Sequence, residues 1–241
     1  DDLSDRERKE FLETANNETD RLTRLVNDVL DLSRLESNRR YQFLALDIHQ
    51  PIEQTLRTYQ LNARDKGIEL VQDIESNLPP VLGNYDLLLQ VFGNLVGNGL
   101  KFSTTGGSVA IRAYRAPSTI DHPDFAGNVR IEIADTGIGI APEDQDAIFD
   151  RFYRVENRVH TLEGTGLGLS IVKNIISKHH SQMCLVSEVG VGTTFWFDLT
   201  VYEASSSKPE SQHLNPAVEP EQEMEMQPAE EETVPVAVQP A

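Results

Sequence analysis

Four short clusters of amide, carboxylate and glycine residues carry the side chains and turns that could perform chemistry in this chain. They are residues 94–101 (N-L-V-G-N-G-L-K), 135–139 (D-T-G-I-G), 164–168 (G-T-G-L-G) and 190–194 (G-V-G-T-T). One glycine pair alone would mean little. In this order, however, an amide-bearing helix, one carboxylate and two glycine-rich turns could enclose a nucleoside triphosphate and its metal ion. The sequence therefore predicts a site for ATP and Mg²⁺.

The first cluster places three polar side chains on one face of a predicted helix. Asn94, Asn98 and Lys101 stand at positions i, i+4 and i+7, so they point the same way. Asn98 can offer an amide oxygen to Mg²⁺, which prefers about six oxygen ligands and takes many of them from phosphates and water. Lys101 would meet a phosphate as a point charge. Taken alone, these residues would equally fit a solvated polar face. The helix also contains Gly93, Gly97 and Gly99. Each glycine costs about 0.5–1 kcal/mol relative to alanine, which indicates close approach by backbone or ligand.

The second cluster joins a carboxylate to two glycines at the end of a predicted strand. Asp135 follows the alternating residues 129–133 (V-R-I-E-I) and precedes Gly137 and Gly139. A carboxylate here can accept a hydrogen bond from the exocyclic amine of adenine, whereas guanine presents an oxygen at that position. The glycines let the backbone pass close to a flat base. A turn without a ligand is the alternative, because D-x-G-x-G is only moderately specific.

The third cluster opens a predicted helix and consists of Gly164, Thr165, Gly166, Leu167 and Gly168. Backbone N–H groups at a helix N-terminus lack intrahelical partners and favour phosphate oxygens. The cluster is not a Walker loop, because no Lys-Ser or Lys-Thr follows the glycines. It also lacks the preceding strand of the dinucleotide fingerprint.

The segment between the second and third clusters is rich in aromatic and basic residues. It contains Phe149, Phe152, Tyr153, Arg154, Arg158 and His160. This composition predicts a lid that folds over the nucleotide, with aromatic anchors and with Arg154 as the candidate contact for the γ-phosphate. For Phe149 and Phe152 individually, core packing is the favoured interpretation. Residues 190–192 predict a turn between two strands, which would at most brace the lid.

The elements that must position these clusters are a long helix and an α/β domain. A heptad stripe over residues 5–37 consists of Phe11, Ala15, Glu18, Leu22, Leu25, Val29 and Leu32. Such a helix needs a partner. A helical hairpin or dimer bundle is favoured over packing on the following domain, because the stripe is narrow and its flanks are charged. Further helices are predicted at 51–64, 85–102 and 167–179, and strands at 68–74, 108–114, 129–134, 183–187 and 194–199. This pattern predicts a two-layer α/β sandwich with a mostly antiparallel sheet.

The composition fits a globular protein and excludes some functions. The 241 residues are 39% hydrophobic and 25% charged, with a formal charge of −18. This charge argues against non-specific binding to nucleic acid. No run approaches the roughly 18 apolar residues of a membrane span, and the first residues do not resemble a signal peptide. The lone Cys184 excludes an internal disulfide. Residues 203–241 are rich in Pro, Glu and Gln and contain no aromatic residue, so we expect a disordered acidic tail.

In their order, the clusters resemble the catalytic and ATP-binding domain of sensor histidine kinases, a branch of the superfamily that includes gyrase, Hsp90 and MutL. The resemblance spans about residues 5–199 and includes residues 148–154 (I-F-D-R-F-Y-R), which are similar to the family's lid motif. Residues 157–163 are similar to those of the non-bleaching sensor kinases of cyanobacteria and algal plastids. The resemblance implies a Bergerat-type ATP-binding fold, with a mixed, mostly antiparallel sheet, helices on one face and a preceding dimerisation helix.

The resemblance also implies roles for individual residues. The catalytic residues would be Asn94, Lys101 and Arg154, and Asn98 would bind the metal. ATP would be bound by Asn94, Asn98, Lys101, Asp135, Gly137, Gly139, Tyr153, Arg154, Gly164, Thr165, Gly166, Leu167 and Gly168. The implied cofactors are thus ATP and Mg²⁺, with Asp135 and its glycines on the adenine.

The implied domains are residues 1–37, the second helix of a dimerisation and phosphoacceptor hairpin, and 38–50, a linker with a short strand. Residues 51–202 would be the catalytic domain and 203–241 the tail. The first hairpin helix, which carries the phosphorylated histidine in this family, is expected to lie outside the chain. The implied partners are a response-regulator receiver domain and a second copy, through the N-terminal helix and its hairpin partner. No nucleic acid is expected, and any membrane anchor would lie upstream, placing this part at the cytoplasmic face.

The implied function is transfer of the γ-phosphoryl group of Mg-ATP to a histidine on that hairpin, for relay to a response-regulator aspartate. Slow ATP hydrolysis of the gyrase or Hsp90 kind and a non-catalytic dimerisation scaffold are the alternatives. Those ATPases place a Glu one turn before the magnesium-binding Asn, where it activates water. Here that position is Asn94, which is no base at neutral pH, and this favours the kinase. The presence of Asn98, Asp135 and the glycines argues against the scaffold.

Overall fold

A computed structural model describes residues 4–37, 40–116, 127–155 and 164–203 of the chain. In chain order its elements are α1 (Asp5–Glu36), β1 (Leu44–Leu46), α2 (His49–Lys66), β2 (Glu69–Ile74), β3 (Val81–Gly83), α3 (Tyr85–Phe102), β4 (Ser108–Arg115), β5 (Asn128–Asp135), η1 (Ala147–Phe149), α4 (Gly168–Lys178), β6 (Cys184–Glu188) and β7 (Gly192–Thr200). The predicted tail lies outside the described residues from position 204 onward.

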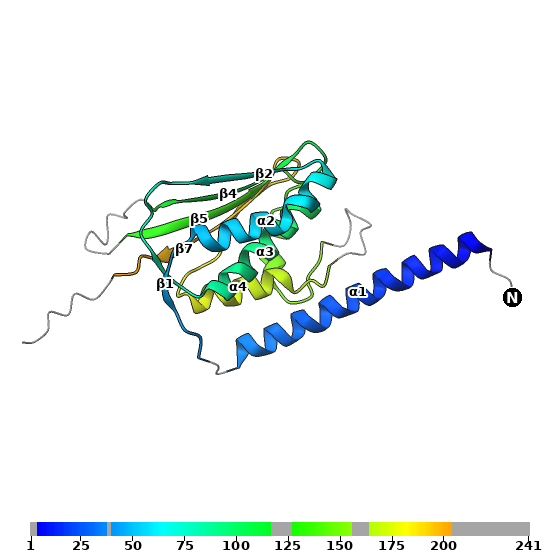
Figure 1. Cartoon of the computed structure of the whole chain (residues 1–241), viewed down its shortest axis with the longest axis horizontal. Coiled ribbons are helices and arrows are strands. Elements are labelled where there is room, and N and C mark those ends of the chain that lie inside the picture. The colour runs from blue at the N-terminus through cyan, green and yellow to red at the C-terminus, as the bar shows by residue number, and fades with distance from the viewer. Residues whose placement is uncertain (1–3, 38–39, 117–126, 156–163, 204–241) are drawn as a thin grey trace, which may run out of the picture. The chain divides into compact units, whose positions relative to one another are not determined.

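A five-stranded sheet forms one layer, in the order β2-β4-β5-β7-β6. Strand β2 runs parallel to β4, and the other neighbouring strands pair antiparallel. Strands β1 and β3 form a separate antiparallel pair. Figure 1 shows α2, α3 and α4 together on one face of the five-stranded sheet. The predicted two-layer sandwich with a mixed, mostly antiparallel sheet is confirmed.

The hydrophobic core lies between this sheet and α3 and α4. Side chains alternate between the two faces of a strand, and those of β4, β5 and β7 that join the core are Val109, Ile111, Ala113, Val129, Ile131, Ile133, Phe195, Phe197 and Leu199. Phe92 of α3 stacks on Phe197, with 6.4 Å between the ring centroids. Ile171 and Ile175 of α4 are fully buried. The core therefore fixes the two helices that carry the first and third clusters.

Helix α3 has the predicted bounds, and its N-terminus joins three parts of the chain. The side chain of Asn84 accepts a hydrogen bond from the backbone N of Leu87 at 3.0 Å, the usual N-cap bond, which is worth about 1 kcal/mol. The backbone N–H of Asn84 donates to Nε2 of the buried His179, just after α4, at 3.2 Å. Its Nδ2 donates to the carbonyl of Gln42, before β1, at 2.9 Å. The start of α3 is thereby tied both to the C-terminal end of α4 and to the linker.

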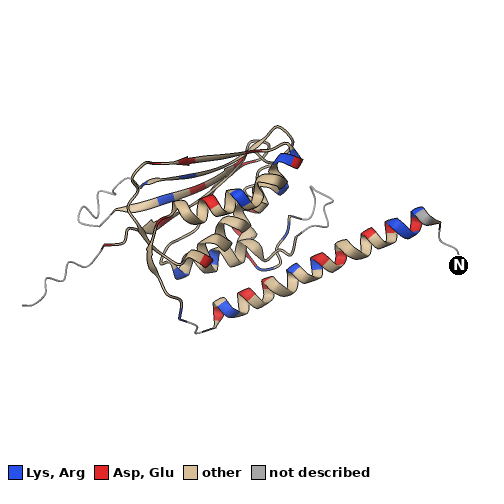
Figure 2. Cartoon of the chain, viewed as in Figure 1, with Lys and Arg blue, Asp and Glu red and all other residues tan. Residues whose placement is uncertain are grey.

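Helix α1 begins with a capping box in which Ser4 and Glu7 bond each other's backbone N–H groups. The apolar stripe of α1 is buried at its C-terminal end and exposed toward its N-terminal end. Leu32 and Leu35 belong to the hydrophobic core, whereas Phe11 is 68% exposed. Figure 2 shows basic and acidic residues distributed along the whole helix. The C-terminal end of α1 therefore packs on the following domain. The exposed part of its stripe still needs a partner helix, as the sequence predicts. Within the described residues, no helix combines the length and hydropathy of a membrane span.

Candidate nucleotide-binding site

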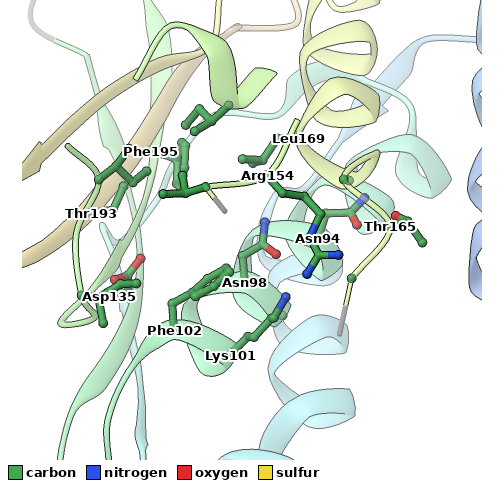
Figure 3. Close-up of a pocket in the computed structure, with 18 of the residues that line it drawn as sticks. Asn94, Asn98, Lys101, Phe102, Asp135, Arg154, Thr165, Leu169, Thr193 and Phe195 are labelled. Atoms are coloured by element: carbon green, nitrogen blue, oxygen red, sulfur yellow. The ribbon is translucent and has the colours of Figure 1, made fainter. Parts of the chain in front are cut away.

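A cavity of about 500 Å³ brings the predicted clusters together. The predicted residues that line it are Asn94, Asn98, Lys101, Asp135, Gly139, Tyr153, Arg154, Gly164, Thr165, Gly166 and Gly168. Gly137 and Leu167 do not line it. Figure 3 shows Asp135 at one end of the cavity, and Lys101 and Arg154 at the other. The site therefore has an acidic end and a basic end.

At the acidic end, Asp135 closes β5 and is held by the loop that follows. Its Oδ1 accepts a hydrogen bond from the backbone N of Gly137 at 2.8 Å. Burial raises the pKa of the Asp135 carboxyl above its ordinary value, while backbone hydrogen bonds from Gly137 and Thr193 oppose the shift. Thr193 and Phe195 lie in the same part of the cavity (Figure 3). Gly137 thus positions the carboxylate instead of lining the cavity.

At the basic end, α3 presents Asn94, Asn98 and Lys101 to the cavity (Figure 3). The Nζ atom of Lys101 lies 4.7 Å from the centroid of the Phe102 ring, which attracts the cation to its face. Oδ1 of Asn94 faces the first turn of α4, because a Cβ at Gly168 would lie 3.1 Å from it. The side-chain amide of Asn98 forms no hydrogen bond with the part of the chain that the structure describes. The Asn98 amide can therefore meet a ligand, and Asn94 and Lys101 line the same cavity.

The third cluster turns the chain into α4 through two left-handed glycines, Gly164 (φ 117°) and Gly166 (φ 74°). Helix α4 begins at Gly168, and its N-cap Leu167 supplies no side-chain cap. The first N–H groups of α4 therefore lack a side-chain acceptor and suit an anion. Leu167 is fully buried, so its side chain anchors the turn in the core. Thr165 lines the cavity.

The two phenylalanines of the predicted lid have different environments. Phe149 in η1 packs edge-on against Phe195, with 6.2 Å between ring centroids, as the core interpretation predicted. For Phe152 that interpretation is wrong, because this residue is 61% exposed and has a left-handed φ of 63°. Its backbone N donates to the carbonyl of Gly166 at 2.9 Å. Phe152 therefore connects the lid segment to the glycine turn instead of filling the core.

The remaining lid residues lie partly inside and partly outside the described chain. Tyr153 lines the cavity, and its hydroxyl donates to Oδ1 of Asp144 at 2.7 Å. Arg154 also lines the cavity. Arg158 and His160 lie outside the described residues. The structure thus places Tyr153 and Arg154 in the cavity wall.

The sequence did not indicate the part of the wall that comes from α1 and α2. These residues are Arg24, Asp28, Tyr59, Asn62 and Lys66. The hydroxyl of Tyr59 donates to the carbonyl of Gly93 at 2.9 Å, and a Cβ at Gly97 would lie 3.3 Å from that hydroxyl. Two of the α3 glycines therefore admit the Tyr59 ring. Their spacing was the available signal, although it could not name the side chain that approaches.

The turn at residues 190–192 braces a different segment from the predicted one. The backbone N of Gly190 donates to the carbonyl of Ile138 at 2.8 Å. Ile138 belongs to the loop that follows Asp135. The turn therefore supports the acidic end of the cavity, and the expectation that it would brace the lid is corrected.

A two-layer sandwich that encloses a cavity with one acidic and one basic end has the charge distribution expected of an ATP-binding domain. Comparison with known families gives the same class. The family described as "Histidine kinase-, DNA gyrase B-, and HSP90-like ATPase" matches residues 83–203, which is half of the chain, and the chain belongs to this family. A second family, "His Kinase A (phospho-acceptor) domain", matches residues 1–38.

The chain is similar to individual proteins that are named as sensory proteins or sensor-like histidine kinases. "Drug sensory protein A" of Synechocystis sp. is 68% identical over 204 residues, which are 84% of this chain and 31% of that protein. "Uncharacterized sensor-like histidine kinase ycf26" of Porphyra purpurea is 55% identical over 83% of this chain and 31% of its own length. The chain thus spans about a third of these relatives. The crystal structure of full-length ShkA in complex with AMPPNP has a TM-score of 0.66 and 31% identity, over 85% of this chain and 41% of ShkA.

Proposed function

We propose that this chain is the ATP-binding catalytic part of a two-component sensor histidine kinase. It transfers the γ-phosphoryl group of ATP to a histidine on a helical hairpin, from which the group passes to an aspartate of a response-regulator receiver domain. The observation that supports this proposal is one cavity with a carboxylate at one end and amides and cations at the other. This cavity occurs in a chain whose first 38 residues match the phosphoacceptor domain family.

The acidic end suits adenine. The Asp135 carboxylate receives backbone hydrogen bonds within its own loop, and the exocyclic amine of adenine supplies a further donor. Guanine would place a carbonyl oxygen against the same carboxylate, and two acceptors repel. Gly139 and Thr193 line the wall beside it. Asp135 therefore binds the base and discriminates between the two purines.

The basic end suits a triphosphate. Lys101 and Arg154 come from different elements and line the same end of the cavity, so each can approach a different face of the phosphate chain. The N–H groups at the start of α4 add partial positive charge. Four basic residues, Arg24, Lys66, Lys101 and Arg154, line the cavity, so a protein with a formal charge of −18 can still hold a polyanion there.

The amide groups of α3 also fit Mg²⁺. Asn98 carries a side-chain oxygen without a partner in the described chain, and Asn94 stands one turn earlier on the same face. Among the described residues no group of three or more His, Cys, Asp and Glu side chains could hold a metal. Asn98 would hold the ion together with oxygens from phosphate and water. When bound there, Mg²⁺ would supply positive charge for the phosphate groups.

The chain contributes position and charge to the transfer itself. The acceptor histidine is the nucleophile, so the cavity has to hold the γ-phosphate in line with it and keep the phosphate oxygens neutralised. Arg154 and Lys101 provide that neutralisation, and Asn94 orients the phosphates beside Asn98. Asn94 has no basic function at neutral pH, so the cavity lacks a side chain at this position that could activate water. This favours phosphoryl transfer over rapid hydrolysis.

The partners follow from the N-terminal helix. The exposed stripe of α1, which includes Phe11 and Leu22, packs against the other helix of the hairpin and against a second copy of the protein. The receiver domain of a response regulator then meets the phosphorylated histidine. In the whole protein, a membrane anchor outside this chain would place the catalytic part at the cytoplasmic face.

A transfer assay tests the proposal. The 241-residue chain is incubated with Mg²⁺, ATP labelled at the γ-phosphate and a separately prepared phosphoacceptor hairpin. Label on the hairpin that is labile in acid and stable in alkali supports a histidine kinase. Rapid release of labelled phosphate with an unlabelled hairpin would replace the proposal by an ATPase. Failure to bind nucleotide would leave only a scaffold.

A further inference from the structure

The loop at the acidic end of the cavity is pressed against the β6–β7 hairpin. We call residues 135–141 the base loop. Gly139 of this loop has φ 69°, and a Cβ there would lie 2.0 Å from the carbonyl oxygen of Glu188. Gly192 of the hairpin has φ 141°, and a Cβ there would lie 2.0 Å from the carbonyl oxygen of Asp135. The two backbones are therefore in direct contact at two points.

The hydroxyl of Ser187 lies at the centre of this contact. Its Oγ accepts a hydrogen bond from the backbone N of Ile140 at 2.8 Å and donates to the carbonyl of Gly192 at 3.0 Å. It also lies 2.8 Å from Oγ1 of Thr193. A serine hydroxyl has one donor and two acceptor positions. With Thr193 as the second donor, the hydroxyl of Ser187 uses all three.

The amide of Gln145 closes the same contact from the other side. Its Nε2 donates to the carbonyl of Ile140 at 3.1 Å and to the carbonyl of Ser187 at 3.1 Å. A glutamine amide nitrogen carries two hydrogens, so both are used, one on each segment. Gln145 thus connects the base loop to β6 through two N–H donors, which a carboxylate at this position would lack.

Neither side chain belongs to the wall of the cavity, but the residues that they hold do. Gly139, Ile140 and Thr193 line the cavity, whereas Gln145 and Ser187 do not. The backbone N and the carbonyl of Ile140 are both fixed, by Ser187 and Gln145 respectively. A shift of the base loop would therefore displace both the cavity wall beside the base and the carboxylate of Asp135.

We propose that Gln145 and Ser187 are positioning residues for recognition of the base, which hold the base loop so that Asp135 meets adenine in a single geometry. This inference rests on the proposed nucleotide site. It adds that selectivity for adenine over guanine depends on these two residues, although neither contacts the nucleotide. If these residues had only a structural role, their substitution would lower stability and weaken the binding of every nucleotide equally.

The test compares Gln145→Glu with Gln54→Glu in the whole chain at mildly alkaline pH. Both variants add one negative charge, but Gln54 is an exposed residue of α2. At Gln145 the new carboxylate faces two carbonyl oxygens, so the base loop has to move. Dissociation constants for Mg-ATP, Mg-GTP and inorganic triphosphate are measured by isothermal titration, and folding is followed by thermal melting.

We expect Gln145→Glu to raise the dissociation constant of ATP by about tenfold, which corresponds to a loss of about 1.4 kcal/mol. The dissociation constants of triphosphate and GTP should change by less than about twofold. The ratio of ATP to GTP affinity should therefore fall by about tenfold in this variant and stay at the wild-type value in Gln54→Glu. Should Gln145→Glu fail to fold, Ser187→Ala tests the same contact with a smaller change, and Ser187→Thr should restore the ratio because it keeps the hydroxyl. An unchanged ratio in folded variants, or an equal loss for all three ligands, would overturn the inference. Wild-type protein that binds no nucleotide would instead refute the proposed function.

Discussion

Replacing the carboxylate of Asp135 by an amide of the same shape is the most direct test of base recognition. In Asp135→Asn the side-chain oxygen can still accept the hydrogen bond from the backbone N of Gly137, which is 2.8 Å long in the wild type. The other atom of the group becomes an NH₂ donor, which faces the donor amine of adenine. The variant therefore removes one charge-assisted hydrogen bond to the base and leaves the fold of the loop in place.

The expected loss follows from the nature of that bond. Hydrogen bonds to charged groups contribute about 1.5–3 kcal/mol, and each 1.4 kcal/mol changes a dissociation constant about tenfold. ATP should therefore bind about 10- to 150-fold more weakly. The upper part of this range is favoured because Asp135 is partly buried, and its charge is poorly screened by water there. Inorganic triphosphate should bind as it does to the wild type.

The assay is isothermal titration of Mg-ATP into both proteins, with Asp73→Asn as the control. Asp73 is an exposed residue of β2, and its substitution removes the same charge away from the cavity. Unchanged ATP affinity in Asp135→Asn would refute the adenine assignment. An equal loss in the control would show that net charge, and not the base contact, sets the affinity.

Without nucleotide, the same variant should be at least as stable as the wild type. Burial raises the pKa of Asp135 above its ordinary value of 3.8, so the fold favours the protonated form. Below pH 3.8 the carboxyl is protonated in both folded and unfolded chains. As the pH rises through the raised pKa, the buried charge forms and the free energy of unfolding falls. Asp135→Asn lacks this charge, so its melting temperature at neutral pH should equal or exceed that of the wild type. A lower value would contradict the reasoning.

Three further changes test other parts of the site. Asn98→Ala should abolish Mg²⁺-dependent transfer to an added hairpin, because it removes the amide oxygen proposed for the metal; wild-type rates would exclude Asn98. Asp28→Asn should tighten ATP about two- to fivefold at low salt, because Asp28 lies in the cavity wall and repels phosphate. Its amide can still accept the 2.5 Å hydrogen bond from Thr165, and a titration series that shows weaker binding would count against this prediction. Burial lowers the pKa of His179 below 6.5, so unfolding free energy should fall as pH drops from 6.5 toward the lowered pKa. In His179→Gln, chemical denaturation should show a flatter pH dependence, and an identical slope would exclude His179 as its source.

Much of the fold could be predicted from the sequence because local signals agree with tertiary packing. A glycine after a helical pattern predicts the end of the helix, and Gly67 ends α2 with φ 64°. The alternation along residues 129–133 places Val129, Ile131 and Ile133 in the core. The polar face of α3 reaches the cavity because Asn94 to Lys101 continue one regular helix. In each case the prediction needed only the side-chain period of a strand (2.0 residues) or of a helix (3.6 residues) and a local turn signal.

The incorrect or missing predictions concern contacts between distant segments. Phe152 looks like a core residue in the sequence, but its left-handed backbone turns it toward solvent. The target of the Gly190 turn depends on the pairing of β5 with β7, which brings residue 135 beside residue 193. Tyr59 reaches the cavity only because α2 packs against the α3 glycines. Local periodicity contains none of this information.

The paired glycines of the base loop and its hairpin limit how this protein can vary. The obstacle to a side chain at Gly139 or at Gly192 is a main-chain carbonyl in each case, and every amino acid has one. No exchange elsewhere could make room by shrinking a neighbour. Descendants of this sequence must therefore inherit both glycines together. Variation at this end of the domain is confined to side chains that point away from the contact between the base loop and the hairpin.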